Sequence, residues 1–145
     1  MIQGNEVRNR CSDMDFENYN QGSFTVGIEG GRLGTILDLG SPWELAQRYG
    51  YAETVDKGQG FASLRFESGK MVVLKSSRPP EVQPLREASA LFQEGRSNAS
   101  APVALGHIYL VRITDRFDKG AQSIVKFSVI AYAPKQFVTI RWSRL

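Results

Sequence analysis

The last forty residues constrain the fold more than any other part of this 145-residue chain. Residues 106–114, 123–132 and 137–143 are dense in β-branched and aromatic side chains, and turn-forming residues separate them. Such side chains favour strands, and short connections join antiparallel neighbours. The sequence therefore predicts a three-stranded antiparallel meander near the C-terminus, against which the rest of the chain packs.

The alternation of apolar residues predicts how the second and third strands of this meander pair. Apolar side chains occupy every other position of both strands: Val125, Phe127, Val129, Ala131, Val138, Ile140 and Trp142. Pairing Val129 with Ile140 places all of them on one face, whereas a slip of one residue separates them. Tyr132 then lies opposite Phe137 next to the turn. This apolar face is expected to lie against the core.

The opposite face of the meander gathers positive charge. In the predicted register Arg112 lies across from Lys126, and Arg141 lies diagonal to Lys126. Like charges directly opposite each other on a sheet are unfavourable, so carboxylates from a packed helix, a bound anion or water must offset them. Phe137 and Tyr132 add aromatic side chains to this surface. These five residues form the predicted binding surface, which suits a protein or an anionic ligand.

Two further pairs of strands are predicted upstream. Residues 23–28 and 33–39 flank a Gly-Gly step, and residues 61–66 and 70–75 flank Glu-Ser-Gly. Glycine accepts the positive φ of tight turns, so each pair is expected to form a β-hairpin. A shorter strand is expected at residues 51–55.

Two helices are predicted between these strands. The first covers residues 42–49, because Ser41 can cap its start, Glu44 completes a capping box and Gly50 follows its end. The second covers residues 81–94, where apolar residues recur at helical spacing: Val82, Leu85, Ala88, Leu91 and Phe92.

The predicted fold is mainly β, an antiparallel sandwich or a partly open barrel that carries the helices 42–49 and 81–94. The alternative is an α+β fold in which the longer helix packs on a single antiparallel sheet. Residues 1–20 show little periodicity and are expected to form a flexible or loosely docked arm, so that one β-rich domain covers residues 21–145. A polar loop is expected at residues 96–102.

Composition and charge narrow the class of protein. Hydrophobic residues make up 41% and charged residues 23%, as in soluble globular proteins, and no apolar run approaches the length of a membrane span. No secretory signal is recognisable, and a single cysteine, Cys11, excludes an internal disulfide, which favours a reducing, cytoplasmic compartment. Residues 106–145 carry seven Lys or Arg against two Asp or Glu. An anionic partner or the acidic remainder of the chain can balance this excess.

No local motif indicates a reaction. The single histidine, His107, begins a predicted strand, and Asp38 follows an apolar run just before a helix start. With Arg32 they define an alternative pocket between the first hairpin and the short helix, where a small hydrolase-like enzyme would act. One His and one Cys do not supply a zinc site, so neither a metal nor another cofactor is predicted.

The main functional hypothesis is a non-catalytic binding or protein-interaction module that uses the mixed basic and aromatic face of the meander. The alternative is the hydrolase-like enzyme, for which no catalytic residue is assigned. A third hypothesis is a weak binder of single-stranded nucleic acid, which stacks bases on aromatic rings and contacts phosphates with basic side chains. A net charge of +3 is a small footprint for that class, so nucleic acid is the least favoured partner.

Overall fold

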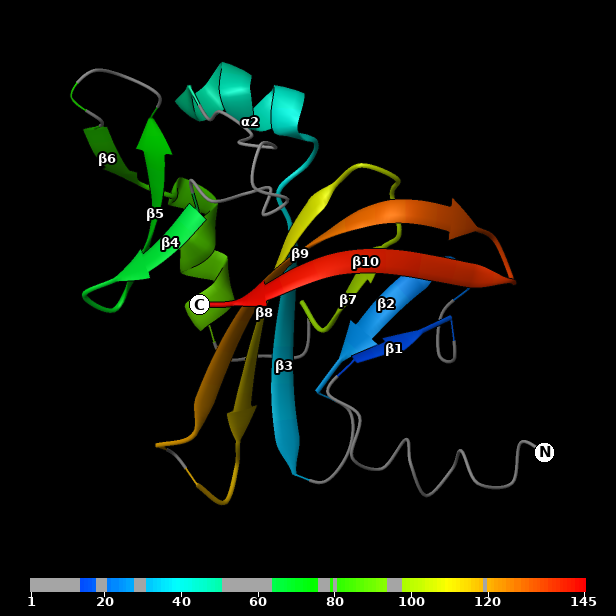
Figure 1. Cartoon of the computed structure of the whole chain (residues 1–145). Helices are drawn as coiled ribbons and strands as arrows, with labels where there is room; N and C mark the ends of the chain where they lie inside the picture. Colours follow the sequence, from blue (N-terminus) through cyan, green and yellow to red (C-terminus); the bar gives the residue numbers. More distant parts are fainter. Residues whose placement is uncertain are drawn as a thin grey trace.

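The computed structural model describes residues 14–17, 21–27, 31–50, 64–75, 79, 81–93, 98–118 and 120–145. Within these ranges, ten strands form three antiparallel sheets, accompanied by one α-helix and one 3-10 helix (Figure 1). The described strands of each sheet run in an open order, and none of the three sheets closes into a barrel. The predicted antiparallel, mainly β fold class is confirmed.

The central sheet has four strands and contains the predicted meander. Its order is β10 (Phe137–Arg144), β9 (Gln122–Ala133), β8 (Ile108–Asp115) and β3 (Arg32–Asp38). The three C-terminal strands are confirmed within two residues at each end. β3, from early in the chain, lies beside β8 and completes the sheet (Figure 1).

The two strands expected to form the first hairpin belong to different sheets. β2 (Ser23–Val26) pairs with β1 (Met14–Phe16) and β7 (Ser100–Pro102), whereas β3 pairs with β8. A Cβ added to Gly27, which has φ 65°, would lie 2.0 Å from the Gly34 nitrogen. The two glycines therefore let the backbones approach closely where the chain passes between sheets. The predicted hairpin is wrong because β2 and β3 pair with strands of different sheets, and the close approach involves Gly27 and Gly34 and not the Gly-Gly step from which the turn was predicted.

The third sheet contains the second predicted hairpin. β4 (Leu64–Glu67) and β5 (Lys70–Lys75) pair across Ser68 and Gly69, and both turn residues have the positive φ that a two-residue turn of type I′ requires. β6 (Glu81–Pro84) pairs with the other side of β5. This hairpin is confirmed in the part that is described.

The α-helix predicted over residues 81–94 is wrong, because the segment divides into β6 and the 3-10 helix η1 (Arg86–Phe92). Pro84 disfavours helical backbone at the residue before it. The Leu85 N–H bonds to the Met71 carbonyl (3.0 Å), which continues the pairing with β5. The buried residues then recur at every third position, the repeat of a 3-10 helix: Leu85, Ala88 and Leu91.

The short helix is confirmed over its full predicted length as α2 (Pro42–Tyr49). The Ser41 hydroxyl accepts a hydrogen bond from the Glu44 N–H (3.3 Å), and the Glu44 carboxylate accepts one from the Ser41 N–H (2.6 Å). Gly50 ends the helix with φ 64°. The capping box fixes the first turn and thereby the position of Pro42 beside the central sheet.

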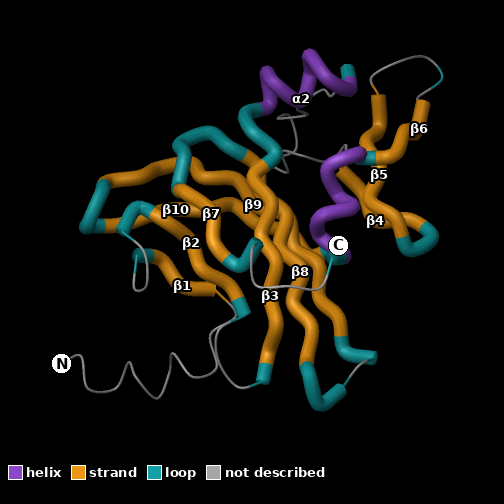
Figure 2. The backbone as a smooth tube through the Cα atoms, turned by 180° about the vertical axis from the view of Figure 1, so that it is seen from behind, coloured by secondary structure: helices purple, strands orange, loops and turns teal. Residues whose placement is uncertain are grey.

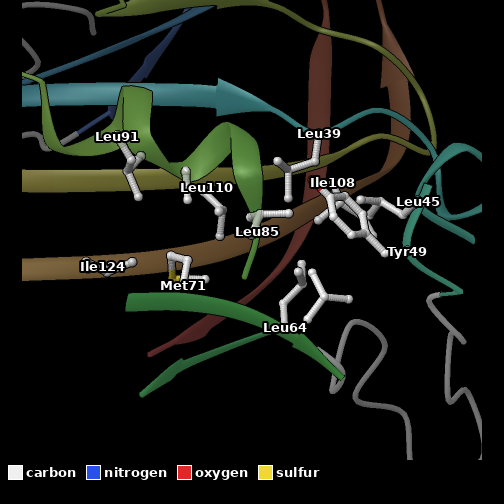
Figure 3. Close-up of a cluster of buried hydrophobic side chains, with 12 residues drawn as sticks. Leu39, Leu45, Tyr49, Leu64, Met71, Leu85, Leu91, Ile108, Leu110 and Ile124 are labelled. Atoms are coloured by element: carbon white, nitrogen blue, oxygen red, sulfur yellow. The ribbon is translucent and has the colours of Figure 1, made fainter. Parts of the chain in front are cut away.

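Each face of the central sheet packs over much of its area against a different layer (Figure 1, Figure 2). The α2 face, which carries Ile108, Leu110 and Ile124, packs against α2, η1 and the β4–β5 hairpin (Figure 3). The β2 face, which carries Tyr109 and Phe127, packs against β1, β2 and β7. The sheet is therefore the middle of three layers. The face predicted to carry the binding surface is therefore covered over much of its area.

In the pairing of β8 with β9, the side chains lie on the predicted faces, but each β8 residue pairs with a β9 residue two positions away from the predicted partner. Arg112 lies opposite Ile124, and Lys126 lies opposite Leu110. The predicted contact of like charges between Arg112 and Lys126 is therefore wrong. A shift of two preserves the faces because side chains alternate with a period of two along a strand.

The pairing of β9 with β10 agrees with the prediction only beyond a bulge. Val129 pairs with Ile140 as predicted, whereas Tyr132 lies opposite Val138 and not opposite Phe137. The register shifts between Thr139 and Ile140, where β9 contributes one residue more than β10. Such a bulge absorbs the extra residue and bends the strands, and apolar alternation alone does not reveal it.

The remaining predictions fall partly outside the described residues. The strand at 51–55 and Cys11 lie outside them, as does most of the N-terminal arm. β7 occupies part of the loop predicted at 96–102, because its backbone pairs with β2. No helix in the described ranges is long and apolar enough to cross a membrane.

Candidate functional site

The basic side chains predicted to form one surface are separated by the packing of the α2 face. Lys126 is 7% exposed, and its ammonium Nζ donates a hydrogen bond to the Leu64 carbonyl of β4 (2.8 Å). A buried charge requires polar partners, so this bond connects β9 to the β4–β5 hairpin. The expected exposure of Lys126 is wrong because the hairpin covers it.

Arg112 is partly covered by η1. Its guanidinium carbon lies 5.1 Å from the centre of the Phe92 ring, a cation–π distance, and its Nε donates to Gln122 Oε1 (2.8 Å). An aromatic ring and an amide therefore contact Arg112, and neither is among the three partners considered from the sequence, which were helix carboxylates, a bound anion and water.

The two aromatic residues of the predicted surface lie on opposite faces. The Tyr132 ring packs edge to face against Phe16 on the β2 face, at 6.0 Å between centres, and its hydroxyl donates to Glu17 Oε1 (3.2 Å). Desolvation and the Glu17 carboxylate raise the pKa of Tyr132. Phe137 is 50% exposed and alternates with Val138, which packs on the β2 face, so Phe137 points to the other side. These rings do not form one stacking platform.

Arg141 faces an open pocket on the α2 face, next to the start of α2. This Arg141 pocket has a volume of about 380 Å³ and is lined by Pro42, Leu105, Ile108, Ser128, Ile130 and Arg141, together with Gly106 and Val129. The volume lies within the range of small-molecule sites. No described residue forms an ion pair or a hydrogen bond with the Arg141 guanidinium. The pocket therefore combines largely apolar walls with one cation.

Backbone hydrogen bonds from the start of β8 hold one wall of the Arg141 pocket. The Gly106 N–H bonds to the Val129 carbonyl (2.9 Å), and the Ile108 N–H bonds to the Gly40 carbonyl beside α2 (2.9 Å). Gly106 has φ 79°, which a residue with a side chain adopts only with strain. The wall is therefore fixed to both β9 and the segment that precedes α2.

Tyr109 fixes the loop that leads into this wall. Its side chain is fully buried, and its hydroxyl donates to the Pro102 carbonyl (2.7 Å) and accepts the Ala104 N–H (2.9 Å). Burial, followed by the charge of Asp38, raises the pKa of Tyr109 to about 12. The loop before Leu105 is thus held by a neutral phenol.

Asp38 and His107, named in the alternative pocket, are in contact. His107 Nδ1 lies 2.9 Å from Asp38 Oδ1 and 3.0 Å from Oδ2, and both side chains are 29% exposed. Because an ionised carboxylate only accepts, Nδ1 carries a proton in this contact, and Nε2 is an acceptor when the ring is neutral. Asp38 Oδ1 also accepts the Gly40 N–H (2.8 Å). The pair thus connects the end of β3 with the start of β8.

Arg32 does not join this pair. It is the first residue of β3 and lies opposite Asp115, whereas Asp38 is the last residue of β3 and lies opposite Tyr109. The strand rises about 3.3 Å per residue, so roughly 20 Å separates their backbones. The expectation that all three polar groups share one pocket is wrong for Arg32, because the extended strand carries it to the other end of the sheet.

Sequence reasoning placed Arg141 on a binding surface and missed the residues that make the pocket around it. Pro42 comes from α2 and Leu105 from the loop before β8, which are far apart in sequence. The available signal was Gly106 ahead of a β-rich run, since glycine readily adopts the positive φ observed there.

Neither a metal site nor a similar protein identifies the function. Among the described residues, no group of three or more His, Cys, Asp or Glu side chains is placed to hold a metal ion. No protein-family model, curated protein or solved structure matches this chain.

Proposed function

We propose that the protein is a non-catalytic binding module whose ligand site is the Arg141 pocket. The observation that carries the proposal is Arg141, which lines a pocket of about 380 Å³ with largely apolar walls and whose guanidinium has no partner among the described residues. Of the five residues in the binding surface predicted from sequence, the proposal retains only Arg141.

The chemistry of the walls supports a small amphipathic carboxylate as the ligand. A guanidinium binds a carboxylate through two parallel charge-assisted hydrogen bonds, and the Ser128 hydroxyl offers a further donor. Leu105 and Ile130, which are 62% and 50% exposed, present hydrocarbon that a ligand would cover. A molecule with an anionic head and a short apolar tail uses both features.

Octanoate tests the proposal when its binding is followed by calorimetry or by amide chemical shifts. Arg141→Gln is expected to weaken octanoate binding about tenfold, because a hydrogen bond to a charged group is lost. Arg144→Gln on the same strand is the matched control and is expected to leave binding unchanged. Equal affinities of the wild type and Arg141→Gln would overturn the proposal.

Octan-1-ol separates the apolar contribution from the charged one. Ile130→Ala removes hydrocarbon from the pocket wall and is expected to weaken octanoate and octanol alike, by about threefold. Arg141→Gln is expected to weaken octanoate and to leave octanol unchanged. The same loss for both ligands with Arg141→Gln would mean that the guanidinium does not bind the carboxylate.

A second candidate function, the hydrolase-like enzyme, is favoured by the contact between His107 Nδ1 and Asp38 Oδ1 (2.9 Å). A histidine oriented by a carboxylate is the usual arrangement of a general base. Hydrolysis of p-nitrophenyl acetate tests it: an enzyme loses at least about a hundredfold in rate with His107→Gln. A rate for the wild type equal to that of the variant would remove this candidate and leave the pair a structural contact.

A further inference from the structure

We propose that the outer edge of β10 binds an acidic peptide segment in extended conformation, which adds to the central sheet as a further strand. β10 stands at one end of the strand order, and no described residue pairs with its outer edge. In Figure 1 it runs as the outermost strand of this sheet. The surface differs from the Arg141 pocket, and the proposal does not depend on a ligand there.

The backbone of β10 offers a row of hydrogen-bonding groups along this edge. The Leu145 N–H bonds to the Ile124 carbonyl of β9 (2.9 Å), so alternate residues before it also face β9. The residues between them, Ile140, Trp142 and Arg144, therefore direct their N–H and C=O groups outward. The Val129 backbone supports the same assignment. Its N–H and C=O bond to the segment at the start of β8, so Ile140, which lies opposite Val129, makes no backbone bond to β9. The segment after the bulge thus presents a regular ladder for a new strand.

Charge decides which kind of strand fits. Residues 121–145 contain four Lys or Arg and no Asp or Glu. On the open edge, Arg144 is exposed and has no ion-pair partner among the described residues, and Lys135 is exposed at the turn before β10. Opposite charges on directly paired strands are favourable, whereas like charges are not. An acidic strand therefore complements this edge.

The same charges disfavour a second copy of this chain on the edge. Antiparallel pairing of two β10 strands would place Arg141 and Arg144 of one copy near those of the other, without a carboxylate between them. Long basic side chains on an edge strand are a known protection against such self-pairing. A partner with carboxylates removes the repulsion.

Apolar contacts with the peptide would strengthen the binding that the opposite charges favour. Trp142 is 63% exposed and shares the β2 face with Arg144 and with Ile140, which packs on the core of that face. An added strand with an apolar residue opposite Trp142 would cover part of this ring, and cross-strand pairs with aromatic residues are favourable. The peptide that fits has acidic residues opposite the arginines and an apolar residue between them.

Two short peptides provide the probe: acetyl-Glu-Thr-Val-Glu-Val-amide for antiparallel pairing and its reversed sequence for parallel pairing. Binding is measured from amide and indole chemical shifts of the full chain. The Trp142 indole signal is expected to shift, whereas that of Trp43, also exposed (69%), is expected to stay and serves as the internal control. Shifts centred elsewhere, or none with either peptide, overturn the proposal.

N-methylated peptides test the backbone bonding itself. In an added strand alternate residues face β10, so methylation of one residue removes a bond and methylation of its neighbour does not. Peptides methylated at the central Val or at the adjacent Glu are therefore expected to differ in affinity by about tenfold or more. Equal affinities of the two peptides would show that the peptide does not bind as a strand.

A charge exchange tests the choice of partner. Arg144→Glu is expected to weaken the acidic peptide by about threefold and to strengthen a peptide in which Lys replaces Glu by a similar factor. Arg86→Glu, a reversal at another exposed arginine, is the control and is expected to change neither. Sedimentation of the wild type completes the test, because a stable dimer that Trp142→Pro dissociates would make a second copy the occupant and overturn the proposal.

Discussion

The two faces of the central sheet are covered by layers of different chemistry. On the β2 face, Phe24, Tyr109 and Phe127 pack as three rings with centres 4.9–5.4 Å apart. On the α2 face, aliphatic side chains from α2, η1 and the β4–β5 hairpin fill the space, with Leu64 and Leu91 fully buried (Figure 3). The core of the β2 face thus contains a cluster of three rings among smaller aliphatic side chains, whereas the core of the α2 face is mostly aliphatic and is assembled from separate elements.

A pocket opens on each face, and the two pockets differ in charge more than in size. The Arg144 pocket, about 350 Å³, lies on the β2 face at the end of the sheet away from α2. Its polar lining is dense: Arg32, Asp115, Gln122, Ser123 and Arg144. The Arg141 pocket has one cation and largely hydrocarbon walls. Volume therefore does not distinguish the pockets, and only the Arg141 pocket has the chemistry of a site for an amphipathic anion.

The largest expected effect is on stability and contrasts the two layers. Phe24→Ala is expected to reduce the free energy of unfolding by about 3–5 kcal/mol, because Phe24 is fully buried and contacts both other rings. Leu91→Ala on the α2 face is expected to cost about 2–4 kcal/mol, since neighbours from separate elements can partly fill the space. Urea unfolding measures both. A greater loss with Leu91→Ala would show that the layer of separate elements is the tighter one.

The next effect concerns Tyr109, whose pKa is raised to about 12 by burial. An unfolded tyrosine ionises near pH 10. The stability that the fold gains from a neutral Tyr109 is therefore fully present below that pH. Between about pH 10 and 12 the unfolded chain releases a proton that the folded chain keeps, and stability falls as pH rises. The loss is on the order of 2 kcal/mol.

Urea midpoints at pH 8, 10 and 11.5 measure this loss, with Tyr109→Phe as the comparison. The variant is less stable at pH 8 by about 1–3 kcal/mol, because the Ala104 N–H and the Pro102 carbonyl lose their partner. Its further decline at high pH is expected to be smaller than that of the wild type. Parallel declines would contradict the assignment to Tyr109.

The parts of the fold that the sequence predicted are those determined by neighbouring residues. The Ser41–Glu44 capping box with Gly50 specifies α2, and the turn at Ser68 and Gly69 specifies the β4–β5 hairpin. Both depend on backbone preferences that a few adjacent residues set. Local chemistry was sufficient there.

The parts that were not predicted depend on contacts between distant segments. Residues 23–39 alone do not indicate that β2 pairs with β7 and β3 with β8, because a Gly-Gly step between two β-rich segments is compatible with a hairpin and also with strands in different sheets. The alternation of apolar residues likewise does not reveal the bulge that places Tyr132 on the β2 face. The site followed the same rule: Arg141 was identified, whereas Pro42 and Leu105 reach its pocket only through the tertiary fold.

The smallest expected effect tests whether the Arg141 pocket depends on the layer that covers its face. Ser41→Ala removes the hydroxyl that caps α2 and is expected to cost about 1 kcal/mol. Because Pro42 follows Ser41 and lines the pocket, octanoate binding is expected to weaken by up to about threefold as the first turn of α2 loosens. Ser89→Ala, at an exposed serine of η1, is the control and is expected to change stability by less than about 0.5 kcal/mol. If Ser41→Ala lowers stability and leaves octanoate affinity unchanged, the pocket is formed by the sheet alone and α2 contributes only to the core.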